Sequence, residues 1–368
     1  MKKKIIPIIL LIICLSMYIN LLGIENKVYS QAVSASTKRY VNPIGRTVGL
    51  KLYTNGVLVV GMSEIDGEDG NKYMPYNGSG IKEGDMIKEI NGKEISNTQE
   101  LINIVNSSNG KEISLKYERE GNLIYTSIVP IKGKDGNYML GLWVRDAAAG
   151  IGTLTYYEEA TKTFAALGHG ITDVDTGNLL NISNGELVTS QIVSIVKGVK
   201  GRTGEIRGII DNGQKIGEIE SNTSIGVYGT VTNIDFINSI KQEELEVAQR
   251  NEIKTGEATI ICQLENDKVE KYQINIKKIY KNSKDNKSML IEITDENLIS
   301  KTGGIIPRYE WNTNCAKQQI YWCYNKCPFK FANRRVCNFC RHDDEIKFWP
   351  FFQLGTVLKW KNCQMGRF

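Results

Sequence analysis

The sequence has 368 residues and a formal net charge of +5, and 41% of its residues are hydrophobic. This length exceeds that of one typical domain, so two domains with additional segments are expected. Acidic and basic residues are interspersed through most of the chain, which argues against a concentrated basic surface of the kind that binds nucleic acid.

The N-terminal residues predict a membrane anchor. Three lysines at positions 2–4 precede an almost uncharged run, Ile5–Ile24, which is long enough to span a bilayer as a helix. We expect residues 1–30 to form a signal anchor with its lysines in the cytoplasm and the rest of the chain exported. Cleavage by a signal peptidase at Val28-Tyr29-Ser30 is the alternative. Residues 31–41 are polar and lack periodicity, which predicts a linker.

Residues 42–132 show a compact succession of predicted strands and turns. The turn pairs Gly84-Asp85 and Asn91-Gly92 lie on either side of a predicted strand. Thr98 then caps an expected amphipathic helix. The apolar stripe of this helix consists of Leu101, Ile102 and Val105. The clearest strands on either side are predicted at 57–60 and 113–117. This order closely resembles that of a PDZ domain.

The resemblance implies that an extended peptide binds as an added strand. The matching loop and strand are residues 48–52, so we expect Gly49, Leu50 and Leu52 to bind the peptide. The alternative is that this domain only positions a neighbouring domain or a partner.

Residues 138–306 predict a mainly β domain. Short apolar or alternating runs are separated by glycines, and this pattern is typical of a barrel or sandwich. The clearest predicted strands are 138–144, 152–156, 188–196 and 225–232. The acidic segment 241–250 is the exception, because its composition favours a helix.

His169 is the only histidine before residue 342. Its imidazole, with an ordinary pKa of about 6.5, is well suited to transferring protons near neutral pH. The segment Leu167-Gly168-His169-Gly170-Ile171-Thr172-Asp173 resembles the histidine motif of the SpoIVB (stage IV sporulation protein B) serine peptidases.

This second resemblance implies a chymotrypsin-like double β-barrel with its active site in the cleft between the barrels. His169 would then be the general base and Asp295 the carboxylate that orients it. Asp173 and Asp175 are closer in sequence and remain alternatives to Asp295. The family implies no metal and no organic cofactor.

The family pattern breaks after residue 306. Residues 301–306 match the lead-in to the family's nucleophile, which continues as Gln-Gly-Met-Ser-Gly-Ser/Thr-Pro-Ile. Here Pro307 and Arg308 follow instead, and Glu310 occupies the place of the serine. A carboxylate at this position cannot perform acyl transfer by the serine route.

The genetic code indicates how the motif was lost. Read one base later, the codons of Tyr309-Glu310 allow Met or Thr, those of Glu310-Trp311 allow Ser or Asn, and those of Trp311-Asn312 force Gly. Gly-Met-Ser-Gly-Thr-Pro-Ile therefore fits the shifted frame. We interpret residues 307–368 as an aberrant tail that follows a one-base shift near Pro307.

The competing interpretation takes the tail as a zinc module. Cysteines and one histidine have roughly the spacing of zinc ligands. These residues are Cys323, Cys327, Cys337, Cys340 and His342. An exported protein would hold these thiols under oxidising conditions, where they tend to pair as disulfides. A tail outside the folded domains is therefore the favoured interpretation.

The resemblance covers roughly residues 1–306. It implies a sporulation serine endopeptidase, membrane-anchored in the space between the forespore and mother-cell membranes, that cleaves a membrane-associated regulator and so triggers activation of a late sigma factor. Without the serine, this chain is expected to be inactive. The alternative function is a membrane-tethered PDZ adaptor or pseudo-peptidase that binds a partner without cleaving it.

Overall fold

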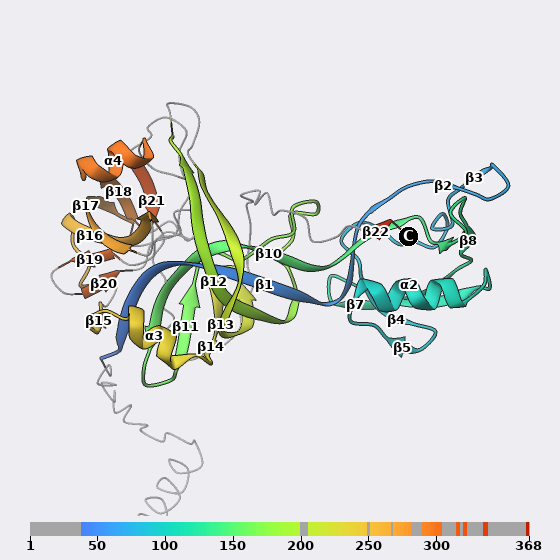
Figure 1. The fold of residues 1–368 in the computed structure, drawn as a ribbon, viewed down its shortest axis with the longest axis horizontal. Helices are drawn as coiled ribbons and strands as arrows, with labels where there is room; N and C mark the ends of the chain where they lie inside the picture. Colours follow the sequence, from blue (N-terminus) through green and yellow to red (C-terminus); the bar gives the residue numbers. More distant parts are fainter. Residues whose placement is uncertain are drawn as a thin grey trace, which may run out of the picture. The chain divides into compact units, whose positions relative to one another are not determined.

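The computed structural model describes residues 38–198, 205–248, 251–265, 268–280 and 289–303, together with four short strands closer to the C-terminus. The chain divides into two units, 1–38 and 39–368, and all described residues except Lys38 lie in the second. Figure 1 shows that strands dominate this unit. The prediction of a mainly β protein is confirmed.

The described residues include no helix long and apolar enough to cross a bilayer. The predicted anchor, 1–30, lies outside the described part of the chain, as does nearly all of the predicted linker.

The region predicted to be a PDZ domain has its own apolar core of strand residues and one helix. The helix α2 (Thr98–Ser107) buries Leu101 and Val105, and the side chain of its N-cap Asn97 accepts a hydrogen bond from Glu100 N. The strands are β2 (Ile65–Asp66), β3 (Lys72–Tyr73), β4 (Met86–Ile90), β5 (Lys93–Glu94), β6 (Ile113–Arg119), β7 (Asn122–Ile128), β8 (Ile131–Lys132) and β9 (Tyr138–Met139). The predicted turn at Asn91-Gly92 joins β4 to β5, and both residues have positive φ, 51° and 76°.

The helix differs in detail from the expectation. It begins at Thr98, but the capping side chain is that of Asn97, because this amide lies one residue before the first helical residue and has extended backbone geometry. Ile104, rather than Ile102, packs against the core beside Leu101 and Val105. The cap lies one residue earlier than predicted, and Leu101 and Val105 remain on the buried face of the helix as expected.

Two long strands, β1 (Tyr40–Met62) and β10 (Leu142–Glu158), pair antiparallel along most of their length and can be followed side by side in Figure 1. The register breaks between Tyr53 and Leu58. Leu50 and Leu52 before the break and Leu58 and Val60 after it contribute to one core, whereas Val57 and Val59 contribute to the PDZ core. β1 therefore contributes to two cores, and the buried leucines of its first half lie in a core separate from that of the PDZ region.

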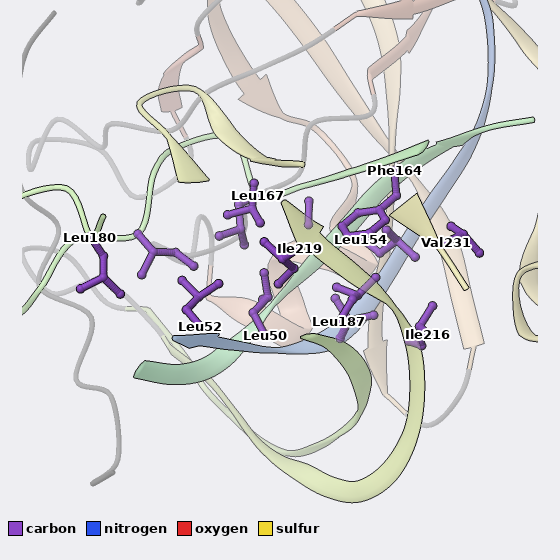
Figure 2. Packing of buried hydrophobic residues seen from close by; sticks show 14 of the residues in the cluster. Leu50, Leu52, Leu154, Phe164, Leu167, Leu180, Leu187, Ile216, Ile219 and Val231 are labelled. Carbon is purple, nitrogen blue, oxygen red and sulfur yellow. The ribbon is translucent and has the colours of Figure 1, made fainter. Parts of the chain in front are cut away.

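The first half of β1 joins a barrel-like arrangement of antiparallel strands. Its neighbours are β11 (Thr163–Ala166), β12 (Ile182–Val196), β13 (Glu205–Thr223) and β14 (Gly226–Val231), which pair in the order β10-β11-β14-β13-β12-β1. Figure 2 shows side chains from these strands, among them Leu50, Phe164 and Ile219, gathered into one apolar core. The order closes, because β1 pairs with both β10 and β12.

A second core lies in the later strands. Cys262, Tyr272 and Ile291 are buried in it. Its elements are β16 (Gly256–Glu265), β17 (Lys268–Ile279), β18 (Met289–Ile293) and the helix α4 (Glu296–Thr302). β17 pairs antiparallel with both β16 and β18. The described residues of the predicted peptidase region therefore form two separate apolar cores.

The helix predicted at 241–250 is absent from the described part of that segment. A short helix, α3 (Ile234–Ile240), ends before it, and β15 (Leu245–Val247) lies within it. Tyr40 and Val41 of β1 pair with β15. Edge pairing with β1 outweighs the weak helix preference of the acidic residues here.

Most of the predicted tail lies outside the described residues. Four short strands are present: β19 (Asn314–Ala316), β20 (Gln319–Tyr321), β21 (Arg334–Cys337) and β22 (Gly366–Arg367). Of the predicted zinc ligands, only Cys337 falls in one of them, and its side chain is not described. Within the described residues no group of three or more His, Cys, Asp or Glu side chains is arranged to hold a metal ion.

Candidate active site

His169 follows β11 in a sharply turned segment. Ala166, the last residue of β11, pairs with Leu154 of β10 and with Val227 of β14. The next residue, Leu167, is buried and has a left-handed φ of 60°, and its amide donates to Thr153 O at 3.0 Å. This conformation is costly for a bulky residue and ends the strand abruptly. The chain therefore changes direction two residues before the imidazole.

The other side of His169 is held by Asn222 on β13. The amide of Ile171 donates to Asn222 Oδ1 at 2.8 Å, and Asn222 Nδ2 donates to Ile171 O at 2.8 Å. Asn222 Nδ2 also donates to Leu180 O at 2.9 Å. The side-chain amide of Asn222 thus holds both the segment after the histidine, at Ile171, and the segment before β12, at Leu180.

Gly170 allows this close approach. A Cβ at this position would lie 2.5 Å from Thr223 O and would also collide with Leu179 Cδ1. The glycine after the histidine is therefore required by packing against β13, which explains one of the two flanking glycines of the sequence motif.

The half-buried His169 ring has a partner in its own backbone segment. Its Nδ1 lies 2.7 Å from Gly170 O. A carbonyl oxygen only accepts, so Nδ1 carries the proton, and Nε2 of the neutral ring is then the basic nitrogen. This is the tautomer that a serine peptidase requires of its general base.

Asp173 and Asp175 are both engaged by Arg145 of β10. Asp173 is almost completely buried, and its Oδ2 pairs with Arg145 Nη1, while Arg145 Nη2 lies 2.8 Å from Asp175 Oδ2. Asp173 Oδ1 accepts from the amides of Asp175 and Thr176 at 3.0 and 2.9 Å. These contacts show that Asp173 and Arg145 hold the loop that follows the histidine.

Asp295 lies between β18 and α4, where it is the N-cap of α4. Its Oδ1 accepts from Leu298 N at 3.0 Å, and its Oδ2 accepts from Gln273 N at 3.1 Å. Both carboxylate oxygens thus bind backbone amides of the second core. Neither of these two contacts involves the imidazole, so the assignment of Asp295 as the orienting acid stays a prediction.

Gly49, Leu50 and Leu52 lie in the first half of β1. Leu50 pairs with Gly150 of β10 on one side and with Leu187 of β12 on the other, and both leucines are fully buried. A Cβ on Gly49 would lie 2.8 Å from Val188 Cγ2. A strand paired on both edges cannot accept a peptide as an additional strand. This arrangement contradicts the prediction that these three residues bind a peptide.

Two residues that organise the site were missed from the sequence. Arg145 follows the uncharged run 138–144. A cation that directly follows an apolar strand indicates a carboxylate partner in the folded protein, because a buried charge without a partner is costly. Asn222 gave no such signal, because its role depends on the pairing of β13 with β14.

Comparison with known proteins gives two family matches. Residues 136–308 match the family described as SpoIVB peptidase S55, and residues 48–129 match the family described as PDZ domain. The first match ends two residues before Glu310.

Single proteins are similar over shorter stretches. Zinc metalloprotease RasP of Shouchella clausii (strain KSM-K16) is 34% identical over 80 residues, which are 22% of this chain and 18% of that protein. LL2128 of Lactococcus lactis subsp. lactis (strain IL1403), also named as a zinc metalloprotease, is 31% identical over 103 residues, 26% of this chain and 24% of that protein. The chain thus spans less than a quarter of the length of these relatives.

One solved structure is the PDZ domain of the SdrC-like protein from Listeria monocytogenes. It is 23% identical, the alignment covers 24% of this chain and 87% of that chain, and the TM-score is 0.20.

Proposed function

We propose that the chain, whose residues 136–308 match the SpoIVB peptidase family and whose residues 48–129 match the PDZ family, derives from a serine endopeptidase of sporulation signalling and is itself inactive. The parent activity is cleavage of a membrane-associated regulator, which triggers activation of a late sigma factor. The chain is anchored by residues 1–30 and works between the two membranes of the developing spore.

The observation that carries this proposal is the combination of a prepared base with a missing nucleophile. His169 is held in a turned segment with Nδ1 at Gly170 O, which leaves Nε2 as the nitrogen to accept a proton. The helix α4 ends at Thr302, and its C-cap Gly303 has a φ of 70°, just before the family's nucleophile motif would begin. Glu310 then stands in place of the serine.

The two separate cores of the described residues support a double-barrel architecture of the chymotrypsin-like type. In such an enzyme the base, its orienting carboxylate and the serine come together at the active site, whatever their places in the chain. His169 belongs to the first core region and Asp295 to the second. We therefore retain Asp295 as the acid of the parent enzyme, where it would serve the imidazole in addition to capping α4.

A fluorophosphonate probe, which reacts with activated serines, tests the proposed loss of activity. The full-length chain in detergent, its His169→Ala variant and a repaired chain that carries Gly-Met-Ser-Gly-Thr-Pro-Ile in the shifted frame are labelled in parallel. We expect labelling of the repaired chain only, and its loss when His169→Ala is added. Labelling of the unrepaired chain that His169→Ala removes would contradict the proposal.

A membrane-tethered PDZ adaptor is the second candidate. The observation that favours it is the apolar core of the PDZ region, whose buried members among the described residues all lie between Val57 and Val144. An inactive chain would then still bind a peptide or protein partner. Isothermal titration calorimetry of the unrepaired full-length chain in detergent with extended peptides tests this candidate: binding supports it, and the absence of binding would contradict it.

A further inference from the structure

We propose that β7 is a docking edge for β7 of a second copy of this chain, which adds antiparallel about a two-fold axis at Tyr125. The two PDZ sheets then continue into each other through the strand order β6-β7-β7-β6. The edge lies within the segment 48–129 that matches the PDZ family. This association goes beyond the proposed function, because it depends neither on catalysis nor on the nucleophile motif.

β7 is the outer strand at one edge of the PDZ sheet. The strands pair in the order β10-β1-β4-β6-β7, and among the described residues β7 pairs only with β6. The pairing with β6 is continuous and has no bulge. Ile128 is buried in the PDZ core, and Thr126 Oγ1 donates to Ser79 O at 2.8 Å, so the strand is firmly held. β7 is therefore a regular edge, opposite to the edge formed by β10.

The turn between β6 and β7 determines which backbone groups face outward. Glu120 and Gly121 form a two-residue turn with positive φ values of 50° and 80°, as a type I′ hairpin requires. The flanking residues Arg119 and Asn122 are then a hydrogen-bonded pair, and such pairs recur at every second residue of an antiparallel ladder. The residues between these pairs direct their amides and carbonyls away from β6. They are Leu123, Tyr125 and Ser127.

An antiparallel register centred on Tyr125 is self-complementary. Tyr125 meets Tyr125 of the second copy, and Leu123 of each copy meets Ser127 of the other. Each of these three pairs exchanges two backbone hydrogen bonds, so about six bonds join the two strands. The register thus uses all the outward-facing amides and carbonyls of β7 and needs no residue outside this strand.

β7 lacks the features that protect natural edge strands from pairing. Such strands are kept apart by lysine, by proline, by bulges or by short length. The sequence of β7 is Asn-Leu-Ile-Tyr-Thr-Ser-Ile, which has seven residues and contains neither a charge nor a proline. Its outward side chains Leu123 and Tyr125 are 54% and 71% exposed. An uncharged, self-complementary strand favours a second copy of itself over a charged partner.

The charges on the neighbouring strand β6 do not oppose this contact. Lys116 lies opposite Tyr125, with its Nζ 5.8 Å from the ring centroid, and it also pairs with Glu89. Glu118 pairs with Lys88 at 3.2 Å. In the joined sheet the two copies of Lys116 are three strand spacings apart, about 14 Å, which exceeds the screening length of about 8 Å at physiological ionic strength. Two tyrosine rings meet at the centre, and aromatic cross-strand pairs are favourable.

Sedimentation equilibrium of the full-length chain in density-matched detergent tests the association, with a reductant present to keep the cysteines from cross-linking. The contact between two strands is small, so we expect a monomer–dimer equilibrium with a Kd on the order of 10–100 μM. A chain that stays monomeric up to about ten times the upper end of this range would overturn the proposal.

Three variants test the residues at the edge. Tyr125→Lys removes the aromatic pair and places like charges directly opposite each other, so it should weaken the association about tenfold. Leu123→Lys should weaken it about threefold. Val193→Lys on β12, where the side chain is 63% exposed, is the matched control and should leave the Kd unchanged. All three should keep the far-UV circular dichroism of the parent chain, because the replaced side chains are exposed. Equal Kd values for Tyr125→Lys and Val193→Lys would contradict the assignment.

Hydrogen exchange with mass spectrometry locates the contact. At a concentration about tenfold above the Kd, the outward amides within 122–128 should exchange about fivefold more slowly than in dilute samples, and Tyr125→Lys should remove this difference. Exchange at 142–146 of β10 should not depend on concentration. Slow exchange of the outward amides at every concentration would show that another part of the same chain covers the edge. Concentration-dependent protection at 142–146 alone would show that copies meet at the opposite edge. Either result would overturn the proposal.

Discussion

The buried ion pair between Arg145 and Asp173 gives the sharpest stability prediction. The Asp173 side chain is 1% exposed and that of Arg145 is 15% exposed. Replacing Asp173 with alanine leaves the guanidinium largely buried without its main partner, and breaking a buried pair in this way costs about 3–5 kcal/mol. The amides of Asp175 and Thr176 also lose their acceptor.

Urea unfolding of the full-length chain in detergent, followed by far-UV circular dichroism, measures this loss. With a slope of about 3 kcal/mol per molar urea, the midpoint of Asp173→Ala should fall by about 1–2 M. Asp175→Ala is the matched control, because Asp175 contacts the same arginine but its side chain is 42% exposed.

An exposed ion pair contributes less than about 1 kcal/mol, so the control should lower the midpoint by no more than about 0.3 M. Equal shifts for Asp173→Ala and Asp175→Ala would refute the reasoning, because they would show that the burial of Asp173 does not determine its contribution.

Three further predictions follow from the same structure. Gly170→Ala should destabilise the protein by about 1–3 kcal/mol through collision with Thr223 O, measured as a lower urea midpoint, and an unchanged midpoint would contradict the packing. Asp295→Ala should cost about 1 kcal/mol of stability through the lost cap of α4, whereas Glu296→Ala, one residue later, should cost less. Hydrogen bonds from Tyr272 and then Lys268 lower the pKa of Glu270 to about 2 from its ordinary 4.5, so its contribution to stability is complete above about pH 4.5 and is lost as the pH falls toward 2. Glu270→Gln should flatten the loss of stability in that range, and an unchanged pH profile would show that the carboxylate is not stabilised by these partners.

Local signals in the sequence predicted much of the fold. The alternating runs at 113–117 and 188–196 lie in β6 and β12, and the pair Asn91-Gly92 forms the expected turn. These features depend on neighbouring residues, so a single sequence contains the information. The start of α2 was displaced by one residue because Asn97 and Thr98 are both able to cap a helix.

Non-local pairing was the part that the sequence did not predict. Val48–Leu52 reads as a PDZ strand, but its partners Gly152 and Thr189 are more than 100 residues away along the chain. Leu142 and Val144 likewise enter the PDZ core from beyond the predicted boundary. The local sequence of a strand does not show which of two candidate strands it will pair with when both have a similar alternation of apolar residues.

The candidate site was predictable only as far as its motif. His169 and its flanking glycines were recognisable from sequence, and the packing of Gly170 against Thr223 gives one of those glycines a physical reason. The contacts of Asp173 with Arg145 and the capping role of Asp295 depend on tertiary structure. Sequence spacing therefore named candidate acids but did not show what each carboxylate binds.

The nucleotide sequence across codons 300–325 tests the central claim most directly. The claim is that a peptidase scaffold with a prepared His169 has lost its nucleophile through a one-base shift near Pro307. The account predicts that reading one base later from this point encodes Gly-Met-Ser-Gly-Thr-Pro-Ile. Codons that yield no serine motif in the shifted frame would contradict it.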